Sequence, residues 1–341
     1  MRASDLMARL VEQRDPSALP AGTAVCLGAF DGLHLGHQAL LDEARSRGEH
    51  IGLVTFDPHP QQVLAPARAP KLLHSPSQRR RVCATLGVEH LVLLPFDREM
   101  AQMQAETFAR TMIIEGLRPE AIVVGEDFRF GRGREGDGEM LAALVKSAGI
   151  EVVRVPAVPV PSPAREATED PSGKLGATAI RRAVELGHVA QAGAMLGRWH
   201  AVEGTVARGA QRGRTFGFPT ANIKTTADLV PPPGVYATFL SVSSTEGPHA
   251  GKIWPAATNL GRNPTFVEDG EMSLEAHVID QDLGETLYDL PVELSFVARL
   301  RDELRFDDPK DLVAQLERDV QTARGRLDAA ALDLVVPPIE P

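Results

Sequence analysis

The sequence predicts two domains of different fold class, an α/β domain with a parallel sheet followed by an antiparallel β domain. In the first half of the chain, short apolar runs alternate with segments of helical spacing, which is typical of a parallel sheet with helices on both faces. From residue 200 to residue 301, strand candidates follow one another with no amphipathic helix between them. Strands joined in that way pair antiparallel, in a barrel or a sandwich. With 341 residues, each half is long enough to bury a core of its own.

The elements of the first half are assigned from apolar runs, helical spacing and turn residues. Near-continuous apolar strands fit a parallel sheet, because both of its faces are covered. The expected strands are 23–30, 50–56, 90–96, 121–125 and 150–156. The expected helices are 38–48, 75–87, 104–115 and 138–149. Ser75 or Ser77 is the expected N-cap of the second helix, because a serine hydroxyl accepts from an unpaired helix N–H.

The second half begins after a long connection. Residues 155–174 are rich in Pro, Ser and Gly and have no periodicity, which predicts a loop. Two short helices are expected within 177–197 and a terminal helix at 309–328. The strand candidates between them are 200–209, 234–243, 252–261, 273–280 and 290–300. These assignments place a first domain at 1–187 and a second at 188–341.

Charge and cysteine content narrow the classes of partner. The net charge of −10 and the pI of about 5.5 disfavour a nucleic-acid or anionic membrane surface. They leave room for local donors that bind a small phosphorylated ligand. No apolar run approaches the ~20 residues of a membrane span, and the two cysteines form no CxxC pair. We therefore expect a cytoplasmic protein with small-molecule partners, no nucleic-acid or membrane partner, and a monomeric or transiently homo-oligomeric state.

The segment FDGLHLGH (30–37) lies between an expected strand and an expected helix. Its glycines let the backbone approach a ligand closely, and the helix N-terminus offers unpaired N–H groups and a positive dipole end to phosphate. His34 and His37 can hydrogen-bond phosphate oxygens there and stabilise charge that develops during group transfer. Two alternatives stay open. One is a helix cap beside an exposed histidine, and the other is an HxxH zinc site, for which no third ligand stands nearby in the sequence.

The segment GRGREG (131–136) satisfies the GxGxxG pattern of dinucleotide-binding folds. The expected strand at 121–125 ends six residues before it, so the tight strand–turn–helix arrangement that gives the pattern its function is absent. We interpret the segment as an arginine-rich loop, either near phosphates or simply solvated.

The segment GTVARGAQRGRTFGFPTANI (204–223) is the second chemical motif. Its spaced glycines and arginines predict a loop that can wrap phosphates with backbone N–H groups. Thr220 and Asn222 follow, two residues apart and on the same side of an extended chain. Their oxygens are hard ligands suited to Mg²⁺. The alternative is a glycine-rich hairpin with surface arginines. The segment contains no GxxxxGK and is therefore not a Walker P-loop.

Both motifs resemble one family. GAFDGLHLGHQALL, TFDPHP (55–60) and VVGEDFRFGRGREGD (123–137) resemble the N-terminal half of the bacterial bifunctional riboflavin kinase/FAD synthetases, a Rossmann-like nucleotidyltransferase of the HxGH type. GxxxGRxxGFPTAN, TNLGRNPTF (258–266) and SLEAHVID (273–280) resemble the riboflavin kinase half, a small antiparallel β-barrel with a terminal helix. The matching stretches run in the same order from about residue 20 to residue 328.

The resemblance implies two successive reactions that each use ATP and Mg²⁺. Riboflavin is phosphorylated to FMN, and FMN is adenylylated to FAD with release of pyrophosphate, so that FMN and FAD are products. The implied catalytic residues are His34, His37 and Glu275. The implied nucleotide-binding residues are Gly28, Phe30, Asp31, Gly36, Thr178, Arg181, Gly209, Arg214 and Gly217. The implied flavin-binding residues are Phe56, Asp127 and Arg299, and the implied metal ligands are Thr220 and Asn222. Arg299 is equally well explained as a solvated charge before the last helix.

Glu275 matches the catalytic carboxylate of the family. Such a carboxylate would orient the terminal ribityl hydroxyl of riboflavin and accept its proton. Strand alternation puts Glu275 on the face opposite Leu274 and Ala276. Periodicity alone therefore predicts an outward-facing side chain, which in a barrel can still border a site at the mouth.

The chain departs from the family at GATAIR (176–181). The family closes its adenylyltransferase site with Ser-Ser-Thr-x-Ile-Arg. Here Gly176 and Ala177 replace the serines, while Thr178 and Arg181 remain. A lost hydroxyl that bonds a charged group costs about 1.5–3 kcal/mol, so we expect a weakened adenylyltransferase. Two alternatives stay open: a riboflavin kinase with an inactive N-terminal domain, and a non-catalytic flavin-binding protein.

Overall fold

The computed structural model describes residues 7–162, 164, 173–209, 212–244, 247–262, 272–330 and 332–336. Parts of the predicted loop 155–174 and of the stretch 258–266 lie outside these residues. Within the described part of the chain, none of the helices has both the length and the apolar content to span a bilayer.

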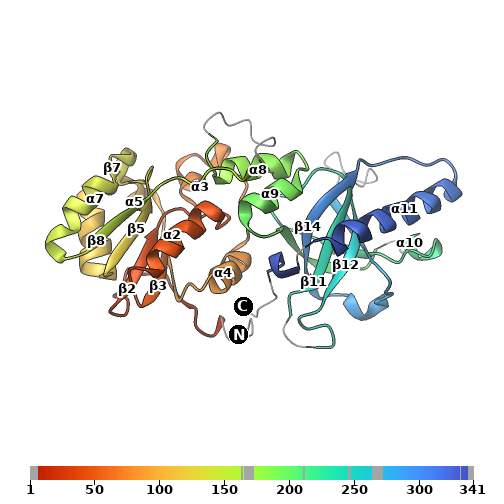
Figure 1. Cartoon of the computed structure of the whole chain (residues 1–341), viewed down its shortest axis with the longest axis horizontal. Coiled ribbons are helices and arrows are strands. Elements are labelled where there is room, and N and C mark those ends of the chain that lie inside the picture. Colours follow the sequence, from red (N-terminus) through yellow and green to blue (C-terminus); the bar gives the residue numbers. More distant parts are fainter. Residues whose placement is uncertain are drawn as a thin grey trace. The chain divides into compact units, whose positions relative to one another are not determined.

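The chain divides into two compact units (Figure 1). The first unit is Met1–Lys71 with Gln78–Pro159, and the second is Leu72–Ser77 with Val160–Pro341. The domain limits expected from the sequence, 1–187 and 188–341, stay a prediction.

The first unit contains a six-stranded sheet in the order β1-β4-β3-β2-β5-β8, and every pairing is parallel. The strands are β1 (Val11–Gln13), β2 (Thr23–Leu27), β3 (His50–Asp57), β4 (His90–Pro95), β5 (Ala121–Gly125) and β8 (Glu151–Val155). All five residues of β2 are buried, as the apolar run predicted. The α/β prediction is therefore confirmed, and of these six strands only β1, a short edge strand without an apolar run, has no predicted counterpart.

The helices of the first unit connect these strands. They are α2 (Leu35–Arg45), α3 (Pro60–Leu64), α4 (Pro76–Thr85), α5 (Arg98–Gln102), α6 (Ala105–Phe108), the π-helical η2 (Ala109–Leu117) and α7 (Gly138–Val145). Helix α7 begins after Asp137, whose carboxylate accepts from the backbone N–H groups of Glu139 and Met140. The Met140 N–H in particular holds the pKa of Asp137 below its ordinary value.

The strand order reverses between β2 and β5. The chain passes from β2 to β3 and β4 on one side, then returns to β5 on the other side of β2. Loops that leave two such neighbouring strands diverge, which opens the usual ligand site of this architecture. The segment 30–37 follows β2, and residues 126–128 follow β5.

The second unit is built on a closed antiparallel barrel in the order β10-β13-β12-β11-β14-β9. Its strands are β9 (His200–Ala207), β10 (Ala221–Lys224), β11 (Gly234–Val242), β12 (Ile253–Arg262), β13 (Met272–Val278) and β14 (Pro291–Arg301). Its helices are α8 (Ala177–Glu185), α9 (Val189–Leu196), α10 (Arg212–Thr215) and α11 (Pro309–Asp328). The predicted barrel and terminal helix are confirmed, and β10 is the barrel strand that the sequence reading did not assign.

Strand alternation separates an inner and an outer core. Tyr236, Leu240 and Phe296 fill the barrel interior. On the outside, Ala237 and Phe239 pack with residues of α11, which lies along the barrel strands (Figure 1). The expected amphipathic spacing of the last helix therefore serves to cover one outer face of the barrel.

Residues 72–77 interrupt the first unit in sequence but pack in the second. The Ser77 hydroxyl donates to Glu203 of β9 at 2.8 Å, and the Ser75 hydroxyl donates to the same carboxylate. The Leu72 N–H donates to Asp228 at 3.4 Å. Helix α4 begins at Pro76, so Ser75 stands at its expected N-cap position.

A buried ion pair fixes α11 to the barrel. The Arg301 guanidinium at the end of β14 donates to both carboxylate oxygens of Asp319, with a shortest distance of 2.6 Å. Gln315 donates to the same carboxylate at 2.8 Å. The Asp319 side chain is only 6% exposed, so removing it would leave the guanidinium without its partner in a largely dry site.

We expect Asp319→Ala to lower the free energy of unfolding of the second unit by about 3 kcal/mol, the typical cost of breaking a buried ion pair on one side. Both tryptophans of the chain, Trp199 and Trp254, lie in this unit, so tryptophan fluorescence during urea unfolding reports on it. The control is Asp280→Ala, which breaks the exposed Arg324–Asp280 pair and should change the midpoint little. Equal midpoints for the two variants would contradict the prediction.

His200 is a buried histidine at the start of β9. The residue is 2% exposed, and its ring centroid lies 6.4 Å from that of Phe296. Burial lowers its pKa from 6.5 to about 4, because a charged imidazolium would lose its hydration. The folded barrel therefore holds His200 neutral.

Acid should destabilise the barrel through His200. Between pH 6.5 and about 4 the unfolded chain binds a proton that the folded chain rejects, so stability falls as the pH falls through this range, by about 3 kcal/mol in total. We expect His200→Gln to flatten this part of the curve of unfolding free energy against pH, whatever its effect at pH 7. Curves of the same shape for the wild type and the variant would refute this account.

Candidate functional sites

The HxGH segment forms a tight turn between β2 and α2. Phe30, Gly32 and Leu33 have φ angles of 36°, 81° and 42°, in the left-handed region. This conformation is unfavourable for the two non-glycine residues. Packing holds them there, because Phe30 is 2% and Leu33 0% exposed. The histidines that follow therefore start from a fixed backbone.

His34 and His37 lie together at the N-terminal end of α2. His34 precedes the helix, and its Nδ1 accepts from the His37 backbone N–H at 3.4 Å. The two imidazole rings stack with centroids 3.7 Å apart and an angle of 19° between planes. The expected helix cap is present, but the capping histidine is only 5% exposed. The arrangement places two imidazoles beside the helix N–H groups, where they can bind phosphate.

The other nucleotide-binding candidates of the first unit surround this turn. The ring of Phe30 covers Gly28, where a Cβ would lie 3.3 Å from the ring. Asp31 is 4% exposed, and Gly36 lies in the first turn of α2. The structure thus brings Gly28, Phe30, Asp31, His34, Gly36 and His37 together on one turn.

The neighbouring strand ends carry the flavin candidates of this unit. Phe56 lies near the end of β3, with its ring centroid 5.4 Å from that of Phe96. Asp127 follows β5, and its carboxylate lies 3.3 Å from the position that a Cβ on Gly125 would take. Because β3, β2 and β5 adjoin in the sheet, the candidates gather at its carboxyl edge.

The GRGREG segment is a hairpin turn. It joins β6 (Arg129–Phe130) to β7 (Gly136–Asp137), which pair antiparallel. Gly131 and Gly133 supply φ angles of 75° and 65° in this turn. The strand–turn–helix arrangement of a dinucleotide site is absent here, as the spacing predicted.

Thr178 and Arg181 lie on α8, in the second unit. The helix begins at Ala177, and Gly176 before it offers no side chain as a cap. A Cβ on Gly176 would meet no heavy atom within 4 Å, and its φ of −167° suits any residue. The expected grip of this segment on a triphosphate stays a prediction.

A row of polar side chains crosses the outer face of the barrel. Glu275 of β13 is paired with Asn222 of β10 on one side and with Asn259 of β12 on the other. Directly paired residues of antiparallel strands share a face, so these three side chains lie side by side. Leu274 and Ala276 point into the core, at 0% exposure, which confirms the predicted alternation. The Ser273 hydroxyl donates to Glu275 at 3.3 Å.

Close approaches shape the glycine-rich loop. A Cβ on Gly209 would lie 2.3 Å from the carboxamide carbon of Asn222, so only glycine lets that side chain lie there. A Cβ on Gly213 would lie 2.3 Å from the carbonyl oxygen of Phe218. Gly217 has a φ of 81°, which favours glycine. The loop is therefore fitted against the start of β10, where Asn222 lies.

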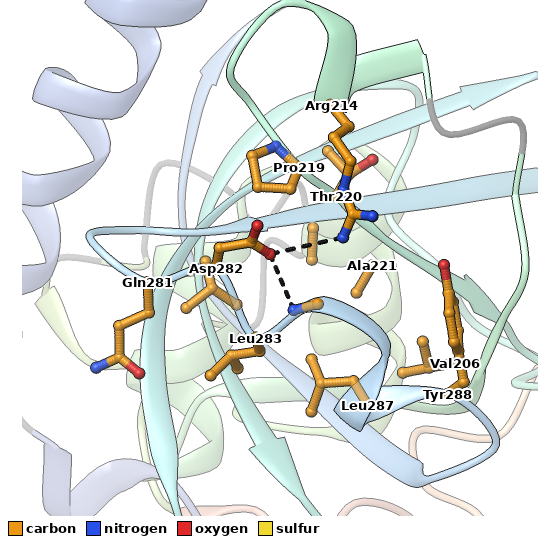
Figure 2. Close-up of a pocket in the computed structure, with 13 residues that line it drawn as sticks. Val206, Arg214, Pro219, Thr220, Ala221, Gln281, Asp282, Leu283, Leu287 and Tyr288 are labelled. Carbon is orange, nitrogen blue, oxygen red and sulfur yellow. Dashed lines mark hydrogen bonds and ion pairs between the residues drawn. The ribbon is translucent and has the colours of Figure 1, made fainter.

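A pocket opens between this loop and the connection from β13 to β14 (Figure 2). It encloses about 510 Å³, the solvent at its mouth included. Its apolar lining is Val206, Ala221, Ala276, Val278, Leu283 and Leu287. Its polar lining includes Arg214, Thr220, Asp282 and Tyr288. Arg214 and Asp282 face each other at 3.9 Å, and the Gly284 N–H donates to Asp282 at 2.9 Å.

The residues expected to hold Mg²⁺ offer oxygen ligands. They are the Thr220 hydroxyl and the Asn222 amide oxygen. Glu275, the expected base, occupies the strand position paired with Asn222. Among the residues that the structure describes, no group of three or more His, Cys, Asp or Glu side chains is placed to hold a metal ion. Mg²⁺ bound with a nucleotide needs only one or two protein ligands, because phosphates and waters supply the rest. The donor set therefore fits Mg²⁺ that arrives with a nucleotide.

Comparison with known proteins matches both units. Residues 17–164 match the family described as FAD synthetase, and residues 196–327 match the family described as riboflavin kinase. The bifunctional riboflavin kinase/FMN adenylyltransferase of Escherichia coli K12 is 32% identical over 308 residues, which cover 89% of this chain and 92% of that protein. The chain belongs to this bifunctional family.

Other relatives agree along the same length. The Bacillus subtilis protein of the same name is 32% identical over 312 residues, covering 89% of this chain and 92% of its own. A crystal structure titled as a macrolide-efflux protein from Streptococcus pneumoniae is 29% identical, with a TM-score of 0.77, and covers 92% of this chain and 98% of its own. The order of the two units is therefore shared along nearly the whole chain.

Arg299 holds structural contacts in this fold. Its guanidinium donates to the Pro233 carbonyl at 2.7 Å and pairs with Asp302 at 2.9 Å. It also lies 5.9 Å from the ring centroid of Tyr236, whose pKa burial raises to about 12. Its expected flavin contact stays a prediction.

The sequence reading did not single out three polar residues near Glu275. They are Asn259, Ser273 and Glu303, and Glu303 reaches the row from beyond β14. A Cβ on Gly261 would lie 2.6 Å from the Glu303 carboxylate and 3.4 Å from the Asn259 amide nitrogen. Strand register brings Asn259 beside Glu275, and the chain beyond β14 brings Glu303, so neither has a local sequence signal. Ser273 lies two residues before Glu275 on the same strand, so strand alternation could have identified it.

Proposed function

We propose that this chain catalyses two successive reactions, the phosphorylation of riboflavin to FMN by ATP and the adenylylation of FMN by a second ATP to give FAD and pyrophosphate. The observation that carries the proposal is the presence of two separate sites of suitable chemistry. One is the stacked histidine pair on the helix N-terminus of the first unit. The other is the Asn222–Glu275 pair on the barrel.

In the kinase step, Glu275 accepts the proton of the terminal ribityl hydroxyl as that oxygen attacks the γ-phosphorus of ATP. The new P–O bond forms FMN while the bond to the β-phosphate oxygen breaks and ADP leaves. Ser273 donates to Glu275 at 3.3 Å and so helps to fix the orientation of the carboxylate. Riboflavin would lie on the outer face of the barrel, beside Glu275.

The pocket beside the glycine-rich loop is the proposed ATP site of this step. Its apolar lining suits a nucleobase, and Arg214 with Thr220 suits phosphates. Thr220 and Asn222 would hold Mg²⁺, which when bound neutralises phosphate charge. The loop thereby links the pocket to the carboxylate on the outer face.

In the adenylyl step, a phosphate oxygen of FMN attacks the α-phosphorus of ATP, and pyrophosphate leaves. His34 and His37 would donate to the phosphate oxygens on which charge develops, together with the N–H groups of α2. Phe56 and Asp127, at the neighbouring strand ends, would contact the flavin nucleotide. Thr178 and Arg181 would contact the triphosphate.

We also propose a cytoplasmic enzyme with small-molecule partners alone and a monomeric or transiently oligomeric state. Both cysteines, Cys26 and Cys83, are buried, and the described part of the chain holds no disulfide between them, which suits a reducing compartment. Burial raises the pKa of the Cys26 thiol well above its ordinary value, so that the thiol stays protonated and unreactive. The acidic composition disfavours nucleic acid.

The test is chromatography of the products formed from riboflavin or FMN with ATP and Mg²⁺. The wild type should form FMN and FAD from riboflavin. Glu275→Gln should lower FMN formation about 10²–10⁴-fold and retain FAD formation from supplied FMN. His37→Asn should lower FAD formation about 10²–10³-fold and retain FMN formation.

Each variant carries its own folding control, because the other reaction must persist. FMN formation at the wild-type rate by Glu275→Gln would remove that residue from the mechanism. FMN without any FAD would favour the kinase-only alternative. Neither product, with riboflavin still bound, would favour the non-catalytic alternative.

The departure at Gly176 and Ala177 gives a gain-of-function test. We expect the double substitution Gly176→Ser with Ala177→Ser to raise FAD formation about ten- to a hundredfold, since each hydroxyl can bond a charged phosphate. The backbone at Gly176 accepts any residue, and nothing lies within 4 Å of a Cβ there. The matched control is Gly176→Ala, which adds the Cβ without a hydroxyl. An unchanged rate of FAD formation in the double variant would show that the lost hydroxyls are not limiting.

A further inference from the structure

Two arginines of the glycine-rich loop contact the β13–β14 connection on the other side of the pocket. Arg214 lies 3.9 Å from the Asp282 carboxylate, and Figure 2 shows its side chain extended toward that carboxylate. Arg208 lies over the ring of Tyr288, 5.3 Å from its centroid. The loop is therefore held to the connection at two points, and one of them is an ion pair at the pocket.

The two partners of the ion pair differ in how firmly they are held. The Gly284 N–H donates to the Asp282 carboxylate at 2.9 Å, which ties Asp282 to its own turn. The Arg214 side chain is 46% exposed and stands on the four-residue helix α10. Behind it, the loop is anchored where His277 donates to the Pro219 carbonyl at 2.9 Å. Asp282 is therefore the fixed partner, and the Arg214 side chain is the part that can move.

We propose that Asp282 is a specificity-determining residue of this pocket. It holds Arg214 in the nucleotide-free protein, and a polyphosphate ligand must take Arg214 from it in order to bind. The inference rests on the proposed function, in which this pocket takes the ATP of the kinase step. For a ligand whose phosphates reach Arg214, the free energy of binding is reduced by the free energy needed to break the Arg214–Asp282 pair. A ligand without phosphates leaves the pair intact.

The strength of the pair sets the size of the effect. With Arg214 46% and Asp282 58% exposed, the pair belongs to the exposed class and is screened by salt. A competing pair of this class weakens the apparent affinity for a polyphosphate about two- to fivefold. Repulsion between the Asp282 carboxylate and the incoming phosphates acts in the same direction.

The experiment is Asp282→Asn in the full-length enzyme. The amide oxygen of asparagine can still accept from the Gly284 N–H, so the turn is kept while the charge is removed. In FMN formation we expect the KM for ATP and the inhibition constant of ADP to fall about two- to fivefold at low salt. The inhibition constant of adenosine should not change. The KM for ATP in FAD formation from supplied FMN should also not change, because none of the residues proposed for that reaction lines this pocket.

The matched control is Glu285→Gln, which removes the same charge from an exposed side chain of the same connection outside the pocket lining. It should leave the inhibition constant of ADP unchanged. An equal effect of the two variants would reduce the result to general charge and overturn the proposal. Tighter adenosine binding in Asp282→Asn would also overturn the proposal, since a change in pocket shape would then be the cause. Weaker ADP binding would overturn it as well, because Asp282 would then be a direct contact of the ligand.

Failure of the proposed function would look different. A wild type that forms no FMN from riboflavin overturns both the function and this inference. A wild type that forms FMN without inhibition by ADP overturns this inference alone. A wild type with normal FMN formation, in which Asp282→Asn leaves the inhibition constant of ADP unchanged, overturns only the role of Asp282.

Discussion

The pairing of β10 with β13 is the constraint on which the kinase face depends. Ile223 pairs with Leu274 inside the barrel, and both are at most 3% exposed. Asn222 and Glu275 must then share the outer face. A slip of one residue would carry Asn222 into the apolar interior and push Ile223 into water. The position of the proposed catalytic carboxylate is therefore determined by what the barrel buries rather than by any contact of the carboxylate itself.

The first unit places its polar groups by a similar principle. Two apolar residues of the turn after β2, Phe30 and Leu33, are held in an unfavourable backbone conformation by burial. The burial of these two side chains fixes the backbone at the start of α2, and thereby the position of the stacked histidines. The strand order then brings the turn after β5 beside them. In both units, buried apolar side chains determine where a few exposed polar groups lie, which is the preorganisation that phosphate chemistry requires.

Much of this could be predicted from the sequence, because periodicity and turn residues act locally. The parallel sheet, the antiparallel barrel, the terminal helix and the outward direction of Glu275 all follow from spacing. Strand β10 could not be predicted in this way, because its four residues are too few to show the alternation of apolar and polar side chains. Asn259 and Asp282 could not either, since cross-strand register and the loop that faces a pocket are properties of the folded chain. The features that were predicted each lie on one continuous segment of the chain. The residues that were missed owe their position to contacts between segments that are distant in the sequence.

The glycines of the second motif show why such a segment is easy to recognise and hard to interpret. The spacing at 209, 213 and 217 suggests a loop that exists to wrap phosphate. In the structure, Gly209 makes room for the Asn222 carboxamide, and Gly213 makes room for the Phe218 carbonyl. Only Gly217 has a positive φ, 81°. An alanine at Gly209 would thus act on the proposed metal ligand before it acted on any phosphate. Two of the three glycines of this motif are therefore required by packing around Asn222 and Phe218.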